Sequence, residues 1–325
     1  MILALDIGTS SVRASLYNDA AEPVRGASAK VEHSLVVSGA GGAEIDADQC
    51  LTQMIEAIDQ LGEKQNKRPH PISHVAISSF WHSLVGIDAN GKPTTKVFSW
   101  ADTRSRKYTE VLRKRFDEAE FHNRTGARFH SSFWPAKLLW LRHERPDAWA
   151  KTARWLSFSD YAAMKLTGDA GTSISMASGT GIFDQRTCDW DGELLRYLKV
   201  TREKLPTIPE ADDVPRKLSS KFAKRWPWLA DSQWFPAIAD GAADNLGSGC
   251  LSKTKAALMI GTSGAMRVAY EGEPPAAIPS GLWSYRIDRK KVIIGGALSD
   301  GGNLYAWMKK NLNLPKDAEE QIAKR

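Results

Sequence analysis

Cysteine is scarce in this chain of 325 residues, which contains three. Cys50, Cys188 and Cys250 stand far apart and form no Cys-x-x-Cys pair, the spacing typical of zinc sites and dithiol redox centres. We therefore expect neither a disulfide framework nor a cysteine metal site. Reduced thiols are the usual state in the cytosol, so the pattern predicts a cytoplasmic protein.

Long apolar runs and basic blocks are also missing. No stretch of 18 or more apolar residues occurs, which argues against a membrane span, and the first residues lack the layout of a signal peptide. The net charge is +6, but Lys and Arg are interspersed with acids. We therefore expect no nucleic-acid partner, and a surface whose positive potential suits an anionic small molecule.

A repeated hairpin is the main positive signal. The chain opens with an apolar strand that runs to Asp6, then a Gly-Thr-Ser-Ser turn and a second strand, and the pattern strand, Gly-Thr-Ser turn, strand returns at 256–270. Backbone N–H groups and hydroxyls of such turns bind phosphate oxygens. The repeat predicts a two-lobed nucleotide binder with one turn from each lobe facing the same phosphate chain.

The remaining pattern predicts an alternating α/β protein with two domains, 1–237 and 238–325. Segment 172–184 is rich in small residues and has two interpretations, a plain loop or a loop that lines an acceptor site. Periodicity and turn residues predict three strands within 1–33, further strands at 74–79, 84–88, 256–260, 265–270, 282–287 and 291–295, and helices at 46–61, 103–122, 134–145, 160–166, 242–250, 302–311 and 316–325.

Five motifs follow one another along the chain: Asp6-Ile-Gly-Thr-Ser10, Trp81-His-Ser83, Trp100-Ala-Asp-Thr-Arg104, Lys137-Leu-Leu-Trp140 with Glu144 and Pro146, and Gly261-Thr-Ser-Gly264. In this order they resemble the FGGY family of carbohydrate kinases, within the actin/hexokinase/heat-shock ATPase superfamily. Trp134 departs from the family by replacing a small residue. The resemblance implies a two-lobed actin/hexokinase-like (ribonuclease H-like) α/β fold. Segments around 80–84, 128–137, 175–181 and 293–302 resemble the gluconate kinase branch most.

The resemblance implies ATP-dependent phosphorylation of a sugar or sugar acid, gluconate first, with a pentulose such as xylulose or ribulose as the alternative. Asp240 stands seven residues before Gly247, the spacing at which relatives place the catalytic base. Asp244 is a second candidate, and capping or surface roles for both acids stay open. Ala239 replaces the glycine that relatives usually carry before the base.

Phosphate and metal contacts follow from the same resemblance. Asp6 would hold Mg²⁺ through water, although an Asp here also caps a turn. Arg13 would reach the γ-phosphate or lie on the surface, and Gly302 would let a helix start approach the nucleotide or simply begin a helix. The expected phosphate-binding residues are Thr9, Ser10, Gly261, Thr262 and Ser263.

Acceptor residues are expected in the first lobe. His82, Asp102 and Arg104 offer donors and acceptors for a polyol, and Trp81 either stacks on the sugar or fills the core. A carboxylate such as that of gluconate favours a guanidinium partner. Arg104 and Arg128 are the candidates, and a structural salt bridge is the competing role for each.

Relatives usually continue well beyond the point where this sequence ends, and no Gly-Gly-Gly adenosine motif occurs here. We therefore expect an incomplete second lobe with an exposed apolar face, weak ATP affinity and a possible homodimer that covers this face. A non-catalytic sugar-binding remnant is the second functional hypothesis. An actin-like ATPase is the third, and the acceptor motif at Trp100 argues against it.

Overall fold

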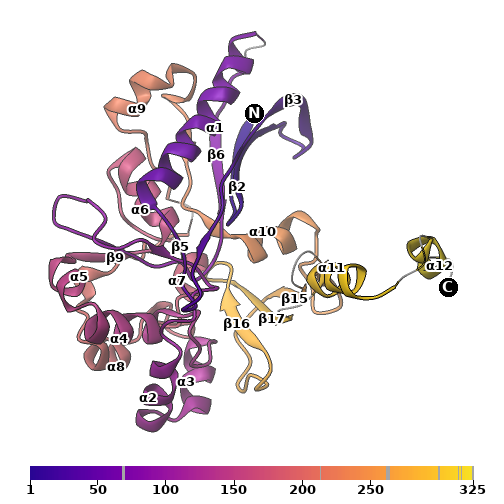
Figure 1. The fold of residues 1–325 in the computed structure, drawn as a ribbon. Helices are drawn as coiled ribbons and strands as arrows, with labels where there is room; N and C mark the ends of the chain where they lie inside the picture. The colour runs from indigo at the N-terminus through magenta and orange to yellow at the C-terminus, as the bar shows by residue number, and fades with distance from the viewer. Residues whose placement is uncertain are drawn as a thin grey trace.

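The computed structural model describes residues 1–67, 70–212, 214–260, 264–298, 301–313, 315 and 317–323. Two sheets dominate this part of the chain, as Figure 1 shows, and each grows from one of the two predicted hairpins. The predicted phosphate contacts Gly261, Thr262 and Ser263 lie outside the described residues. Within the described ranges, no helix combines the length and apolar character needed to cross a bilayer.

The first sheet has the order β12-β6-β1-β2-β3, with β13 also paired to β6. Its strands are β1 (Ile2–Ile7), β2 (Ser11–Tyr17), β3 (Pro23–Glu32), β6 (His74–Ser79), β12 (Gln233–Trp234) and β13 (Ile238–Ala239). The β1–β2–β3 meander is antiparallel, whereas β1, β12 and β13 run parallel to β6. Helix α1 (Ala47–Lys67) packs on β2 and β3 (Figure 1). It begins where predicted, because Asp46 Oδ1 accepts a hydrogen bond from the Gln49 N–H at 2.9 Å.

The rest of the first lobe contains a second hydrophobic core built around Phe121, Phe129, Trp134 and Trp155. Its short strands are β4 (Val36–Val37), β5 (Ala43–Ile45), β7 (Val85–Ile87), β8 (Val97–Phe98), β9 (Arg154–Leu156), β10 (Phe183–Asp184) and β11 (Asp189–Trp190). Its helices are α2 (Lys107–Arg115), α3 (Glu118–Thr125), α4 (Trp134–Glu144), α5 (Pro146–Lys151), α6 (Phe158–Thr167), α7 (Ile174–Ser178), α8 (Gly192–Leu198) and α9 (Ser220–Arg225), with 3₁₀ turns at Arg202–Lys204 and Pro227–Leu229. The buried apolar side chains of α6 and α9 pack with those of the first sheet and not with the second core.

The second sheet is antiparallel with the order β14-β15-β17-β16. It consists of β14 (Ala256–Ile260), β15 (Gly264–Glu271), β16 (Trp283–Arg286) and β17 (Lys291–Leu298). Helix α10 (Asp240–Gly247) contacts β6 and β13 of the first sheet and β14 and β15 of the second, so it bridges the two sheets. Helices α11 (Gly302–Asn311) and α12 (Ala318–Ala323) follow and extend to the side in Figure 1.

One face of the second sheet is apolar and bare. Leu258 and Ile260 of β14 are 66% and 71% exposed. Leu5 and Ile7, which hold the equivalent positions before the Gly-Thr-Ser turn of the first hairpin, are 1% and 0% exposed. The predicted apolar face of an incomplete second lobe is therefore present.

Two predicted elements were wrong in detail. The expected helix over 103–122 is two helices, because Phe116 is extended and Asp117 starts α3 by accepting hydrogen bonds from the Ala119 and Glu120 N–H groups. The expected loop over 172–184 contains helix α7. Ser173 caps this helix by accepting from the Met176 N–H at 3.0 Å.

Candidate functional site

Three parallel strands of the first sheet end at one edge, and the candidate site is built there. Asp6 of β1 and Ile238 of β13 both pair with Ser78 of β6. The residues that directly follow β6 and β13 are Phe80 and Asp240, so the register brings Asp240 to the edge that carries Asp6. The carboxyl ends of parallel strands are the usual position for ligands in open α/β sheets.

Asp240 is the first residue of α10, and its carboxylate accepts a hydrogen bond from the Gly241 N–H at 2.7 Å. The side chain reaches solvent, yet the surrounding protein atoms desolvate the carboxyl and raise its pKa to about 6. The negative charges of Asp6 and Asp244 act in the same direction, and Arg267 opposes them. A carboxylate with this pKa accepts a proton more readily than an ordinary aspartate does.

Asp244 is tied into a different contact. Its carboxylate pairs with Arg267 Nη1 at 3.0 Å, and Arg267 is 8% exposed. This ion pair favours Asp240 over Asp244 as the free carboxylate of the site. Sequence reasoning missed Arg267, although a basic residue between Ala265 and Ala269 on the buried face of an apolar strand is a recognisable signal.

Asp6 is exposed at the same edge, where desolvation raises its pKa and Arg13 on the paired strand opposes that shift. Within the described residues, no group of three His, Cys, Asp or Glu is placed to hold a metal. Mg²⁺ keeps most of its waters and needs one or two carboxylates, so Asp6 beside Asp240 fits this ion. The adjacent turn is ordered by the Gly8 N–H, which donates to Ser11 O at 2.9 Å, and it presents Thr9 and Ser10.

His82 is the third residue after β6 and has φ = 66°, a left-handed conformation that is uncommon for a residue with a side chain. Its Nδ1 lies within hydrogen-bond distance of Gly179 O, and its ring packs against Phe133 and Tyr285. Burial lowers the pKa of His82 to about 3, so the imidazole is neutral. Since Nδ1 faces a carbonyl oxygen, it carries the proton of the neutral ring, and Nε2 is left as an acceptor that suits a sugar hydroxyl.

Trp81 fills the core and is 6% exposed. Its Nε1 donates to Ser175 O at 2.9 Å, and its ring meets Trp283 and Tyr285 edge-on. The structure therefore favours the core role over sugar stacking. Trp100 of the acceptor motif is more accessible than Trp81, with 45% of its surface exposed. No role of its own was predicted for Trp100 from the sequence.

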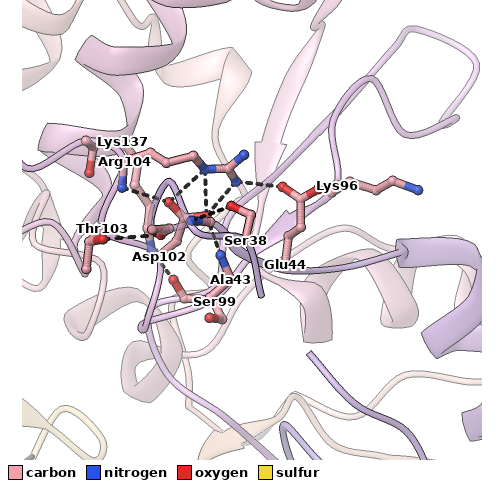
Figure 2. Close-up of polar contacts among 12 residues, drawn as sticks. Ser38, Ala43, Glu44, Lys96, Ser99, Asp102, Thr103, Arg104 and Lys137 are labelled. Carbon is pink, nitrogen blue, oxygen red and sulfur yellow. Dashed lines mark hydrogen bonds and ion pairs between the residues drawn. The ribbon is translucent and has the colours of Figure 1, made fainter. Parts of the chain in front are cut away.

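Asp102 and Arg104 are partners of each other, as Figure 2 shows. Asp102 is 2% exposed and also accepts from the Ala43 N–H at 3.0 Å. Arg104 Nε lies 3.0 Å from Asp102 Oδ2, Nη2 lies 2.6 Å from Glu44, and the guanidinium stacks over Trp140 at 4.9 Å. These contacts favour the structural salt bridge over a substrate-binding fork for Arg104.

Replacing Arg104 by methionine is expected to lower the free energy of unfolding by about 3 kcal/mol, because it leaves the buried Asp102 carboxylate without its cation. Urea denaturation followed by circular dichroism measures this loss. Arg104→Met combined with Asp102→Asn should recover part of it, since the unpaired charge is then gone. Equal stability of the single and double variants would contradict this account.

Arg128 lies between the lobes. Its Nη1 donates to Ser280 O at 2.8 Å, and Nη2 lies 3.4 Å from Glu118. Its side chain remains 48% exposed, so it keeps donors for an anionic ligand. Gly302 is half-buried and is the first residue of α11.

A separate open cavity of about 830 Å³ lies beside the Arg104 network. It includes Asp46, Lys96 and Trp140 but none of Asp6, His82 and Asp240. The carboxylates of Asp6 and Asp240 and the candidate phosphate turn lie at the edge where the parallel strands end. The site is therefore assigned to this edge and not to the cavity lined by Asp46, Lys96 and Trp140.

Comparison with known proteins identifies the family of this chain. Residues 1–243 match the model of the FGGY family of carbohydrate kinases, N-terminal domain. Two curated relatives are the gluconokinase of Bacillus subtilis, 26% identical over 95% of this chain and 59% of the relative, and its xylulose kinase, 25% identical over 99% and 64%. The chain thus spans about three-fifths of the length of these relatives.

Solved structures of a gluconate kinase and a xylulose kinase also match this chain. The gluconate kinase of Lactobacillus acidophilus matches with a TM-score of 0.89 and 28% identity over 97% of this chain and 63% of its own. The ligand-bound xylulose kinase of the same organism matches with a TM-score of 0.91 and 27% identity over 99% and 65%. The two-lobed actin/hexokinase-like fold with an incomplete second lobe is therefore confirmed, and the chain belongs to the FGGY family of carbohydrate kinases.

Proposed function

We propose that this chain carries the acceptor site and the catalytic base of an ATP-dependent sugar or sugar-acid kinase, with gluconate as the first acceptor and xylulose or ribulose as the alternative. The observation that carries the proposal is the pairing of two exposed carboxylates, Asp6 and Asp240, at the edge where three parallel strands end. The pKa of Asp240, raised to about 6, supports a proton-accepting role near neutral pH.

In this mechanism, Asp240 accepts the proton of the attacking hydroxyl as the γ-phosphoryl group moves in line from the nucleotide to the sugar. Asp6 would hold Mg²⁺ through water, and this ion would supply positive charge beside the phosphates. Thr9 and Ser10, together with the second turn at Gly261, Thr262 and Ser263, contact the phosphate chain. Arg13 and Gly302 remain candidate nucleotide contacts.

On the acceptor side, the neutral His82 binds a hydroxyl, and Arg128 with its exposed guanidinium binds the carboxylate of a sugar acid. Gluconate stands first because gluconokinases are among the relatives and because Arg128 keeps donors for a carboxylate.

A non-catalytic sugar-binding role is the second candidate. The coverage of about three-fifths of the relatives and the bare apolar face of the second sheet favour it, since both leave the nucleotide side short of partners. The retained Asp6 and Asp240 favour catalysis.

A coupled ADP-release assay with Mg-ATP tests the proposal against gluconate, xylulose, ribulose and glycerol. Release that depends on one acceptor establishes a kinase and names its substrate. Sugar binding by calorimetry without turnover supports the non-catalytic candidate. Phosphate release with no acceptor present points to an ATPase. If the chain shows no sugar binding and no turnover, both candidates are refuted.

The exposed apolar face of the second sheet predicts weak ATP binding and a homodimer that covers Leu258 and Ile260. Replacing both residues by lysine should shift the sedimentation coefficient to that of a monomer, because charges oppose burial of this face. Lysine at Val36, an exposed valine outside this sheet, is the matched control. A monomeric wild type that binds ATP at micromolar concentration contradicts the prediction.

A further inference from the structure

Lys137 of α4 is a lysine buried in the first lobe, with 1% of its surface exposed. Its Nζ donates to three backbone carbonyls, those of His82 at 3.0 Å, Ser99 at 2.7 Å and Ser132 at 2.7 Å. The three carbonyls belong to segments that are far apart in the sequence. They follow β6, follow β8 and precede α4.

These segments form the acceptor side of the candidate site. His82 holds a strained left-handed backbone, which persists only where the surroundings fix it. Ser99 directly precedes the exposed Trp100, and the Ser132 hydroxyl donates to Trp100 O at 2.7 Å. The neighbouring Ser83 carbonyl is held by Trp134 Nε1 at 2.9 Å, one turn before Lys137. One ammonium group therefore connects the segments of His82, Trp100 and Ser132.

The number of donors makes the charge state important. An ammonium group has three N–H donors, and all three are used here, whereas a neutral amine has two. Burial lowers the pKa of Lys137 to about 7, with Asp102 favouring the charged form and Arg104 opposing it. The other titratable groups that face Lys137 are His82 and His130, and the positive charge of Lys137 lowers the pKa of both.

We propose that Lys137 is a positioning residue whose three hydrogen bonds hold the His82, Ser99–Trp100 and Ser132 segments in the arrangement that binds the acceptor. The proposal rests on the proposed function, because it assigns these segments to the acceptor. It adds a regulation by pH. Loss of the ammonium proton leaves two donors for the three carbonyls, so acceptor affinity falls as pH rises.

Lys137→Met keeps an unbranched side chain that is one atom shorter and removes every donor, and Arg142→Met on the same helix is the matched control. Calorimetry with gluconate or xylulose is expected to show about tenfold weaker binding in Lys137→Met, the cost of losing a charge-assisted hydrogen bond. Wild-type affinity should fall severalfold between pH 6 and pH 8.5. The affinity of Lys137→Met should not depend on pH in the same way, and Arg142→Met should follow the wild type.

Hydrogen exchange without sugar separates this role from general stability and from the proposed function. Lys137→Met should exchange faster at 80–84, 99–102 and 130–133 but not in β1. In the wild type the same segments should lose protection from pH 6 to pH 8.5 after correction for intrinsic rates, a readout that needs no variant. Uniformly faster exchange, or protection and affinity unchanged by both the substitution and pH, overturns the proposal. A wild type that binds no acceptor refutes the proposed function alone.

Discussion

Asp240→Asn is expected to lower kcat about 10³-fold with the acceptor that supports ADP release, while the KM for this acceptor stays within a fewfold. The asparagine keeps the shape of the side chain and can still accept the hydrogen bond from the Gly241 N–H, but it cannot take the hydroxyl proton. General bases contribute roughly 10²- to 10⁴-fold to such reactions. The coupled assay at saturating Mg-ATP measures the loss.

Asp244→Asn is the matched control on the same helix. Asp244 is bound to Arg267, so its loss frees that guanidinium beside Asp240 and should lower the rate by less than tenfold. If Asp244→Asn loses the larger factor and Asp240→Asn keeps most of its rate, then the base is Asp244 and the assignment here is wrong.

Stability gives a second readout of Asp240 that needs no turnover. Its pKa is raised from 3.8 to about 6 on folding, so between these values the folded protein binds more protons than the unfolded one. Stability from this group is therefore present at low pH and is lost as pH rises through 6. Asp240→Asn should raise the free energy of unfolding at pH 7.5 by about 1 kcal/mol, after allowance for solvent screening of an exposed side chain. The gain should vanish near pH 4.

The sequence predicted the elements whose pattern is strong. β1 alternates Leu3, Leu5 and Ile7 toward the core, and α1 carries both a capping Asp46 and an apolar face, so period and caps agreed. The chain order of the motifs was enough to predict the two-lobed fold and to select Asp240 as the candidate base.

The sequence did not predict contacts that depend on distant partners. Arg104 forms an ion pair with Glu44, 60 positions away in the sequence, and Lys137 donates to the carbonyl of His82, 55 positions away. No local sequence pattern encodes such contacts. Helix α7 was missed because a five-residue helix of small side chains shows no clear period. The choice between core and stacking for Trp81 likewise needed its partner Ser175, 94 positions away.

Gly126→Ala is expected to cost about 4 kcal/mol or more in free energy of unfolding, which is a large part of the roughly 5–15 kcal/mol that a typical protein has. Gly126 ends α3 in a left-handed conformation with φ = 73°. A Cβ there would lie 1.5 Å from Ser284 O and 2.7 Å from Ser284 C, and both are backbone atoms that cannot turn aside. Urea denaturation or thermal melting measures the loss.

Gly168→Ala is the control that separates conformational strain from this clash. Gly168 also ends a helix, α6, with φ = 87°, but a Cβ there meets nothing within 4 Å. Its substitution should cost about 1 kcal/mol, the strain of a left-handed alanine. Similar losses in both variants would show that the backbone around Ser284 moves aside easily.

Gly126 lies where the end of α3 contacts the second sheet. The Ser284 N–H donates to Gly126 O at 3.0 Å, His122 Nε2 lies 2.9 Å from Leu282 O, and the Ile278 N–H donates to Asn123 Oδ1 at 2.8 Å. The end of α3 is thus bonded to the second sheet and the loop before it by one backbone pair and by two α3 side chains. If the two lobes close over a sugar, as the proposed function expects, these contacts are the ones that would join them throughout. Gly126→Ala removes the fit at this contact, so we expect it to abolish acceptor-dependent turnover along with stability.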